Sequence, residues 1–241
     1  AAAIRDGIGC PVVCTLQGEA PFLDALPPDY ASAAWAELAS RANDVAGFIA
    51  VSEYTGALMR ERLGLAEEAV HVVPNGIELG EFEPQARRPE RPTIGYLARM
   101  CPDKGLDRLI DAFLELRAGD RVPGMRLLAG GVLLGEDRAW LRGLEEKVRS
   151  AGAEADVELR PNLSKSAKHE LVAGCSLVSV PALYGESFGL YVIEALACGV
   201  PVVQPRTAGF TEIVEATGGG TLYDPERPGA YAEALEALLL D

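Results

Sequence analysis

The chain has 241 residues, of which 49% are hydrophobic and 24% are charged, and this mix excludes a disordered chain. Residues 1–82 hold 4 basic and 12 acidic side chains and the remainder hold 18 and 24, so both parts contribute to the net charge of −14. A large nucleic-acid surface and adsorption to anionic lipid both need clustered cations, so the charge argues against them. A single local cationic pocket remains compatible with it.

Cysteine usage and the start of the chain predict a cytoplasmic protein. The five cysteines include no C-x-x-C pair, and Cys10 and Cys14 alone do not make a metal site, so we expect reduced, mostly buried thiols. No apolar run is long enough to cross a bilayer, and the first residues lack the pattern of a signal peptide. His71 and His169 are predicted to be structural or surface residues.

In the first part, three short apolar runs predict strands at 11–16, 47–52 and 70–74. Amphipathic patterns between them predict helices at about 30–42 and 53–63. A complete Rossmann-type domain has about six strands, so this part resembles the back half of such a domain.

The second part alternates in the same way. Its predicted strands lie at 93–97, 125–130, 157–160, 176–181 and 201–205. Its predicted helices lie at 105–117, 136–150, 165–174, 188–198 and 229–240. Short strands that are apolar on both faces are typical of a buried parallel sheet, so the predicted fold class is α/β with two Rossmann-like domains.

The segment 80–93 is rich in proline and charged residues and interrupts the alternation of strands and helices, so we predict that it is a linker. We place a domain boundary near residue 85, giving domains 1–85 and 86–241. The first domain is then incomplete, and the chain also stops on an uncapped helix. We therefore expect a piece of a longer protein, or self-association through the sheet surface left exposed.

The stretch 181–203 runs from a strand through a loop into a helix and another strand. Glu186 lies at the carboxyl end of the first strand, the edge where open α/β sheets bind ligands, and Glu194 lies about a turn into the helix. Four residues are predicted to open that helix with free N–H groups suited to an anion: Ser187, Phe188, Gly189 and Leu190. Taken alone, the stretch also fits a Ser-capped helix with two solvated glutamates, and local chemistry by itself slightly favours that interpretation.

A second strand–loop–helix stretch, 95–113, carries two cations at the same sheet edge, Arg99 and Lys104. Cations near helix N-termini are unfavourable unless an anion lies between them, and a diphosphate would satisfy both. The alternative is a pair of surface cations matched to Asp103 or Asp107.

Together the two stretches resemble the retaining, nucleotide-sugar-dependent glycosyltransferases of family 4. The resemblance rests on Arg99 and Lys104 before Gly105 and on two glutamates with seven residues between them. The segments 45–82 and 208–225 also resemble family segments. The resemblance implies the GT-B architecture of two Rossmann-like domains and a nucleotide-sugar donor as co-substrate.

The resemblance also implies roles for individual residues. Arg99 and Lys104 would hold the donor diphosphate and stabilise the leaving group. Glu186 would bind the sugar hydroxyls, and Glu194 would bind the ribose. The backbone N–H groups near the phosphate and sugar would come from Phe188, Gly189 and Leu190.

Two positions match the family less closely. The loop 160–164 corresponds to the place where backbone groups around Arg160 and Leu163 read the base, but Pro161 stands where the family often has glycine. Gln17 stands where the family often has a histidine close to the sugar, and glutamine cannot titrate near neutrality. Either Gln17 has only a positional role, or another residue does the work of that histidine, or the activity is changed.

The sequence contains no D-x-D motif, so we expect no metal and assign the diphosphate to cations and helix N-termini. The predicted reaction moves a sugar from a nucleotide donor to an acceptor hydroxyl with retention. Front-face attack is favoured over a covalent enzyme intermediate because no protein nucleophile is evident. The alternatives are a nucleotide-sugar epimerase of the same architecture and a non-catalytic nucleotide-sugar-binding module. The sequence does not identify the acceptor.

Overall fold

The computed structural model describes residues 1–82, 84 and 88–241, and the chain forms two compact units. The first unit comprises residues 1–76 together with 184–189. The second unit comprises residues 77–183 and 190–241. The domain boundary predicted near residue 85 lies outside the described residues.

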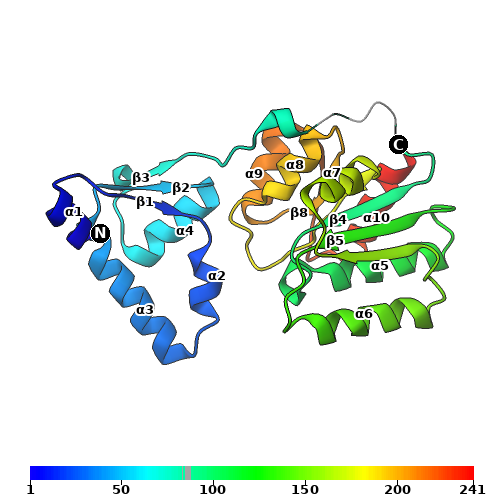
Figure 1. Cartoon of the computed structure of the whole chain (residues 1–241), viewed down its shortest axis with the longest axis horizontal. Helices are drawn as coiled ribbons and strands as arrows, with labels where there is room; N and C mark the ends of the chain where they lie inside the picture. Colours follow the sequence, from blue (N-terminus) through cyan, green and yellow to red (C-terminus); the bar gives the residue numbers. More distant parts are fainter. Residues whose placement is uncertain (83, 85–87) are drawn as a thin grey trace. The chain divides into compact units, whose positions relative to one another are not determined.

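The first unit is built on a parallel sheet of three strands in the order β1-β2-β3 (Figure 1). The three predicted strands and both predicted helices are present, whereas α1 and α2 were not predicted. The strands are β1 (Val13–Leu16), β2 (Gly47–Ala50) and β3 (Val70–Val72). The helices are α1 (Ala2–Ile8), α2 (Glu19–Asp24), α3 (Pro28–Arg41) and α4 (Glu53–Leu63), with 3₁₀ turns at η1 (Ala42–Asp44) and η2 (Glu67–Ala69).

The second unit holds a six-stranded parallel sheet in the order β6-β5-β4-β7-β8-β9. Counted from β4, this is the Rossmann order 3-2-1-4-5-6, whose direction of winding reverses between β4 and β7. All five strands predicted from sequence are present, and β9 is an additional edge strand. The bounds are β4 (Thr93–Leu97), β5 (Arg126–Gly131), β6 (Val157–Pro161), β7 (Leu177–Val178), β8 (Val202–Pro205) and β9 (Gly220–Tyr223).

Helices cover both faces of this sheet, as the buried strands predicted. The α5 and α10 helices pack together on one face beside α6, and α7, α8 and α9 lie on the other (Figure 1). The helices are α5 (Leu106–Ala118), α6 (Arg138–Ser150), α7 (Lys165–Ala173), α8 (Leu190–Ala197), α9 (Ala208–Thr217) and α10 (Ala230–Leu240), with 3₁₀ turns at η3 (Leu79–Glu81) and η4 (Pro102–Lys104). The α/β class with parallel sheets is therefore confirmed.

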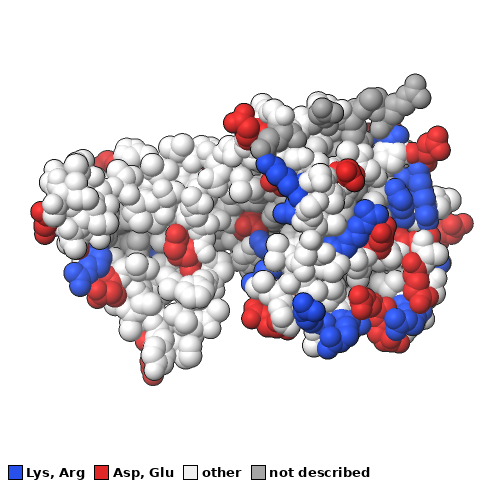
Figure 2. Space-filling model, in the orientation of Figure 1, with Lys and Arg blue, Asp and Glu red and all other residues white. Residues whose placement is uncertain are grey.

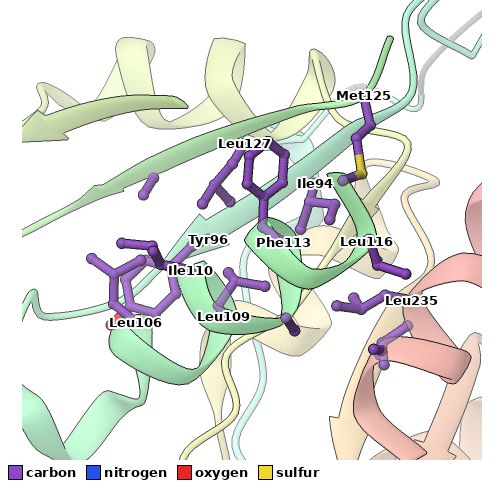
Figure 3. Packing of buried hydrophobic residues seen from close by; sticks show 14 of the residues in the cluster. Ile94, Tyr96, Leu106, Leu109, Ile110, Phe113, Leu116, Met125, Leu127 and Leu235 are labelled. Atoms are coloured by element: carbon purple, nitrogen blue, oxygen red, sulfur yellow. The ribbon is translucent and has the colours of Figure 1, made fainter. Parts of the chain in front are cut away.

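The core of the second unit forms where α5 meets the sheet. Figure 3 shows Phe113 of α5 packed against Leu127 and Ile94 of the strands, and all three side chains are fully buried. On the opposite face Gly95 leaves room for the segment that follows α7: a Cβ there would lie 2.6 Å from the Cys175 Sγ. Because all five residues of β4 are buried, this central strand is fixed from both sides.

One predicted helix start is wrong. The α8 helix begins at Leu190, so Ser187, Phe188 and Gly189 precede it and do not form its first turn. The physical reason is the backbone of Gly189, whose φ of 94° lies in the left-handed region and cannot belong to a right-handed helix. Of the four N–H groups assigned to this helix start, only that of Leu190 lies within it.

The surface of the second unit carries charges of both signs. In Figure 2, Lys and Arg side chains are interspersed with Asp and Glu on the visible face of this unit and do not form one large basic patch. None of the helices described is both long and apolar enough to span a membrane.

Candidate functional site

A pocket of about 480 Å³ opens in the second unit at the carboxyl ends of β4 and β5, next to the point where the winding reverses. Open α/β sheets bind ligands at such a point. Strand ends and the two helices α7 and α8 supply most of the lining. The lining residues are Phe82, Leu97, Ala98, Arg99, Gly131, Val132, Lys165, Lys168, His169, Val172, Leu190, Tyr191, Glu194 and Cys198.

The charge of this pocket is opposite to that of the chain. Among the described residues that line it, Arg99, Lys165 and Lys168 are cationic and Glu194 is the single carboxylate. The chain as a whole has a net charge of −14. An acidic protein that gathers cations around one concave site offers that site to an anion.

Arg99 follows β4 and is held by two acidic residues near the start of α6. Its Nη2 donates to Glu136 Oε1 at 2.8 Å and to Asp137 Oδ2 at 2.9 Å. The Asp137 carboxylate is almost buried, whereas the Arg99 side chain is 42% exposed. The hydrogen bond to Asp137 raises the pKa of Arg99. Arginine is always charged in proteins, so the guanidinium places a positive charge at the pocket wall.

Lys104 ends the 3₁₀ turn η4 and lies beside the pocket. Its Nζ is 5.7 Å from the centre of the Tyr191 ring, within range of a cation–π contact, and Tyr191 lines the pocket. The next residue, Gly105, has φ 72°, and a Cβ there would lie 2.4 Å from the carbonyl oxygen of Pro181. The two loops that follow β4 and β7 therefore touch at a position that only glycine can occupy.

Glu194 projects from the second turn of α8 into the pocket. Burial raises the pKa of its carboxyl, and the charges of Lys168 and His169 on α7 oppose that shift. A half-buried carboxylate beside cations can accept hydrogen bonds from a diol. This is the environment that the ribose role requires.

The loop 184–189 belongs to the first unit and carries Glu186. The Glu186 side chain is only 9% exposed, and its Oε2 accepts a hydrogen bond from the Tyr184 hydroxyl at 2.8 Å. The Ser187 hydroxyl donates to the backbone oxygen of Gln17 at 2.7 Å. The structure thus brings Gln17 to the loop that holds Glu186 and Phe188, through its backbone and not its exposed side chain.

The predicted base-reading loop, 160–164, begins at the end of β6. Arg160 lies on β6, where it pairs with Glu158 at 2.6 Å, and it does not line the pocket. Leu163 packs over Gly130 of β5. Asn162 fixes the loop: with φ 59° it donates its N–H to Gly131 at 2.7 Å and accepts from the N–H of Leu133 at 3.0 Å.

Most of the lining residues were not assigned to the site from sequence, among them Phe82, Lys165, Lys168 and His169. Phe82 and His169 form a tilted ring pair with centroids 4.8 Å apart. Lys165 and Lys168 line the pocket from α7, the helix that also carries His169. The i, i+3, i+4 spacing of the three α7 residues was the available signal, since it puts them on one helix face. No group of three or more His, Cys, Asp and Glu in the described part of the chain is placed to hold a metal.

Comparison with protein-family models decides the family. Residues 80–241 match the model described as "Glycosyl transferases group 1", and residues 1–81 match the one described as "Glycosyltransferase Family 4". The chain belongs to the group 1 glycosyltransferases.

Curated relatives of this group 1 chain include the D-inositol 3-phosphate glycosyltransferases of Mycobacterium bovis and Mycobacterium tuberculosis. Each is 33% identical over 179 residues, and the alignment covers 70% of this chain and 36% of the relative. The chain thus spans little more than a third of the length of these relatives.

Solved structures of low sequence identity share the fold. The Anabaena protein HepE, crystallised in complex with UDP and glucose, superposes with a TM-score of 0.81 at 21% identity, covering 100% of this chain and 65% of HepE. Sucrose-phosphate synthase from Thermosynechococcus elongatus gives a TM-score of 0.78 at 22% identity, covering 95% and 58%. These neighbours are of the GT-B type, which confirms the predicted fold class.

Proposed function

We propose that the protein transfers a sugar from a nucleotide-sugar donor to an acceptor hydroxyl. The observation that carries the proposal is the pocket at the winding reversal, where Arg99 and two lysines surround Glu194 in an otherwise acidic chain. A diphosphate supplies the anion for the cations, and a ribose supplies the diol for the carboxylate. Membership of the group 1 family supports the same assignment.

Different residues bind different parts of the donor. Arg99 and Lys104 bind the diphosphate and stabilise the negative charge that develops on the leaving nucleoside diphosphate. Glu194 binds the ribose. Glu186 binds hydroxyls of the transferred sugar, and Gln17 has a positional role beside its loop.

Backbone groups complete the proposed site. The N–H groups of Phe188, Gly189 and Leu190 face the phosphate and sugar, although only Leu190 belongs to α8. The loop around Arg160 and Leu163 contacts the base through its backbone. Support for this comes from Asn162, which ties the loop to the end of β5 next to the pocket.

We also propose that transfer retains the anomeric configuration and needs no metal. The cations around the pocket take the place that a metal and an acidic pair would otherwise fill in charge stabilisation. Retention follows from the family resemblance, and front-face attack requires no protein nucleophile. Finally, we propose a domain boundary near residue 85 and a cytoplasmic location, as the sequence predicts.

The acceptor is an alcohol, and D-inositol 3-phosphate is the first one to test because the curated relatives act on it by name. We would incubate the protein with UDP-glucose, GDP-mannose or ADP-glucose, with and without this acceptor, and follow products by mass spectrometry. A glycosylated acceptor supports the proposal. An altered sugar formed without acceptor indicates an epimerase, and donor binding without any product indicates a binding module.

A further inference from the structure

Two buried hydroxyl groups lie beneath the loop that carries Glu186, and the proposed function gives them no role. Ser52 follows β2 and caps α4, where its Oγ accepts the N–H of Thr55 at 3.1 Å. Ser52 is 2% exposed and Thr55 is 3% exposed. Buried hydroxyls are costly unless they are hydrogen-bonded, so the partner of each one is informative.

Both hydroxyls meet the same backbone oxygen. The Ser52 Oγ donates to the carbonyl of Ser187 at 2.6 Å, and the Thr55 Oγ1 lies 3.4 Å from that carbonyl. The two hydroxyl oxygens are 3.0 Å apart. A helix cap needs only the acceptor function of Ser52, so its hydroxyl proton is left to bind the loop.

Further contacts seat the loop on the first unit. The Ser187 hydroxyl donates to the Gln17 backbone oxygen at 2.7 Å. Gly185 has φ 86° and packs so closely on α4 that a Cβ would lie 2.4 Å from the Tyr54 hydroxyl oxygen. The loop therefore contacts the residues around both β1 and α4.

We propose that Ser52, assisted by Thr55, is a positioning residue of the donor site. The carbonyl of Ser187 and the N–H of Phe188 belong to one planar trans peptide, so they point in opposite directions. A carbonyl fixed toward Ser52 aims the Phe188 N–H away from α4, as a preorganised donor for the nucleotide sugar. Glu186 is one residue before the fixed peptide, so its backbone is held with it. This inference rests on the proposed function, which assigns donor binding to both residues.

The sharpest test separates the cap from the loop contact at one position. Ser52→Gly keeps most of the capping strength, because glycine is itself a favoured N-cap residue. It removes the hydroxyl that holds the loop. Ser52→Thr keeps both the cap and the hydroxyl, and Thr55→Val removes the second hydroxyl while keeping the side-chain shape.

Two readouts apply to the full chain. Loss of one hydrogen bond favours local opening of the loop by about tenfold, so deuterium exchange of peptides spanning 184–190 should rise by about that factor in Ser52→Gly, less in Thr55→Val and little in Ser52→Thr. Calorimetry should use the best-binding pair among UDP and UDP-glucose, GDP and GDP-mannose, and ADP and ADP-glucose. Loss of one hydrogen bond is worth about tenfold in affinity, so Ser52→Gly should weaken the nucleotide sugar by about that factor. The free diphosphate should be weakened less, since Glu186 contacts only the sugar.

The inference is overturned if Ser52→Gly exchanges and binds like the wild type, or if Ser52→Thr behaves like Ser52→Gly. A wild-type chain that binds none of the three pairs refutes the proposed function instead. The exchange experiment then still decides whether Ser52 holds the loop, and unchanged exchange would refute that as well.

Discussion

Arg99 donates two hydrogen bonds to a single carboxylate oxygen of Asp137, from Nη2 at 2.9 Å and from Nε at 3.3 Å. Asp137 is 8% exposed and precedes α6, so it holds the guanidinium from the protein side. Arginine presents a planar fork of donors, and a carboxylate bound to one edge fixes the direction of the others. This pairing connects the orientation of the proposed phosphate ligand to a residue that does not line the pocket.

Replacing Arg99 by alanine should lower nucleoside diphosphate affinity tenfold to a hundredfold, because a charged hydrogen bond worth about 1.5–3 kcal/mol is lost. Asp137→Asn should cost less, since it keeps the cation and weakens only its orientation. Lys104→Ala should fall in the same range as Arg99→Ala. Titration calorimetry measures all three, and unchanged affinity in both cation variants would refute the diphosphate assignment.

The two glutamates should differ in the ligand that they affect. Glu194→Gln should weaken the free nucleoside diphosphate and the nucleotide sugar alike, because its proposed partner is the ribose. Glu186→Gln should weaken only the nucleotide sugar, and its amide oxygen can still accept from Tyr184, which makes it a mild change to the loop. Matching profiles for the two variants in the same titrations would contradict this division.

Glu194 should also make stability depend on pH. Burial raises its pKa in the folded chain above the ordinary value of 4.5, so the native state binds this proton more tightly than the unfolded state. Wild-type stability is therefore favoured below the ordinary pKa and declines as pH rises through the raised one. Glutamine does not titrate, so the melting temperature of Glu194→Gln minus that of wild type should increase from pH 4.5 upward. Parallel melting curves across that range would show that the carboxyl does not carry the shift.

Donor binding should survive removal of divalent metals. The proposed charge stabilisation comes from Arg99 and Lys104, so EDTA should leave nucleoside diphosphate affinity within twofold of its original value. The measurement is a thermal shift with and without chelator, followed by added Mn²⁺ or Mg²⁺. If EDTA lowers the affinity and either metal restores it, the diphosphate is bound by a metal site and not by Arg99 and Lys104 alone.

The strands and longer helices were predictable because their patterns are local. All eight predicted strands are present, since each is a short apolar run between breakers. The missed helices are α1, α2 and α9, of which α1 and α2 are only 7 and 6 residues long. The edge strand β9 was also missed, because only one of its four residues is buried and it lacks a continuous apolar run. The start of α8 was missed because the φ of Gly189 depends on the seating of the preceding loop, which is a tertiary effect.

The site was predictable only in part for a similar reason. Arg99 and Glu194 lie in local strand–loop–helix patterns, and the structure places both in one pocket. The acids considered as alternative partners of the two cations were Asp103 and Asp107, whereas Arg99 pairs with Asp137, on the chain segment that follows the neighbouring strand β5. Pairings across the sheet edge depend on strand order, and one sequence without relatives does not reveal that order.

The first unit is discontinuous in sequence, and this has a practical consequence for anyone who divides the protein. The chain passes between the units after Gly76, after Leu183 and again after Gly189. A fragment that starts after the linker would keep Arg99 and Glu194 but would carry the Glu186 loop without Ser52. A chimera that exchanges only the N-terminal segment would similarly combine the Glu186 loop of one protein with the loop-contacting residues of another. Such chimeras should keep their affinity for the nucleotide but discriminate less between sugars. Transferring residue 52 together with the loop should restore the discrimination.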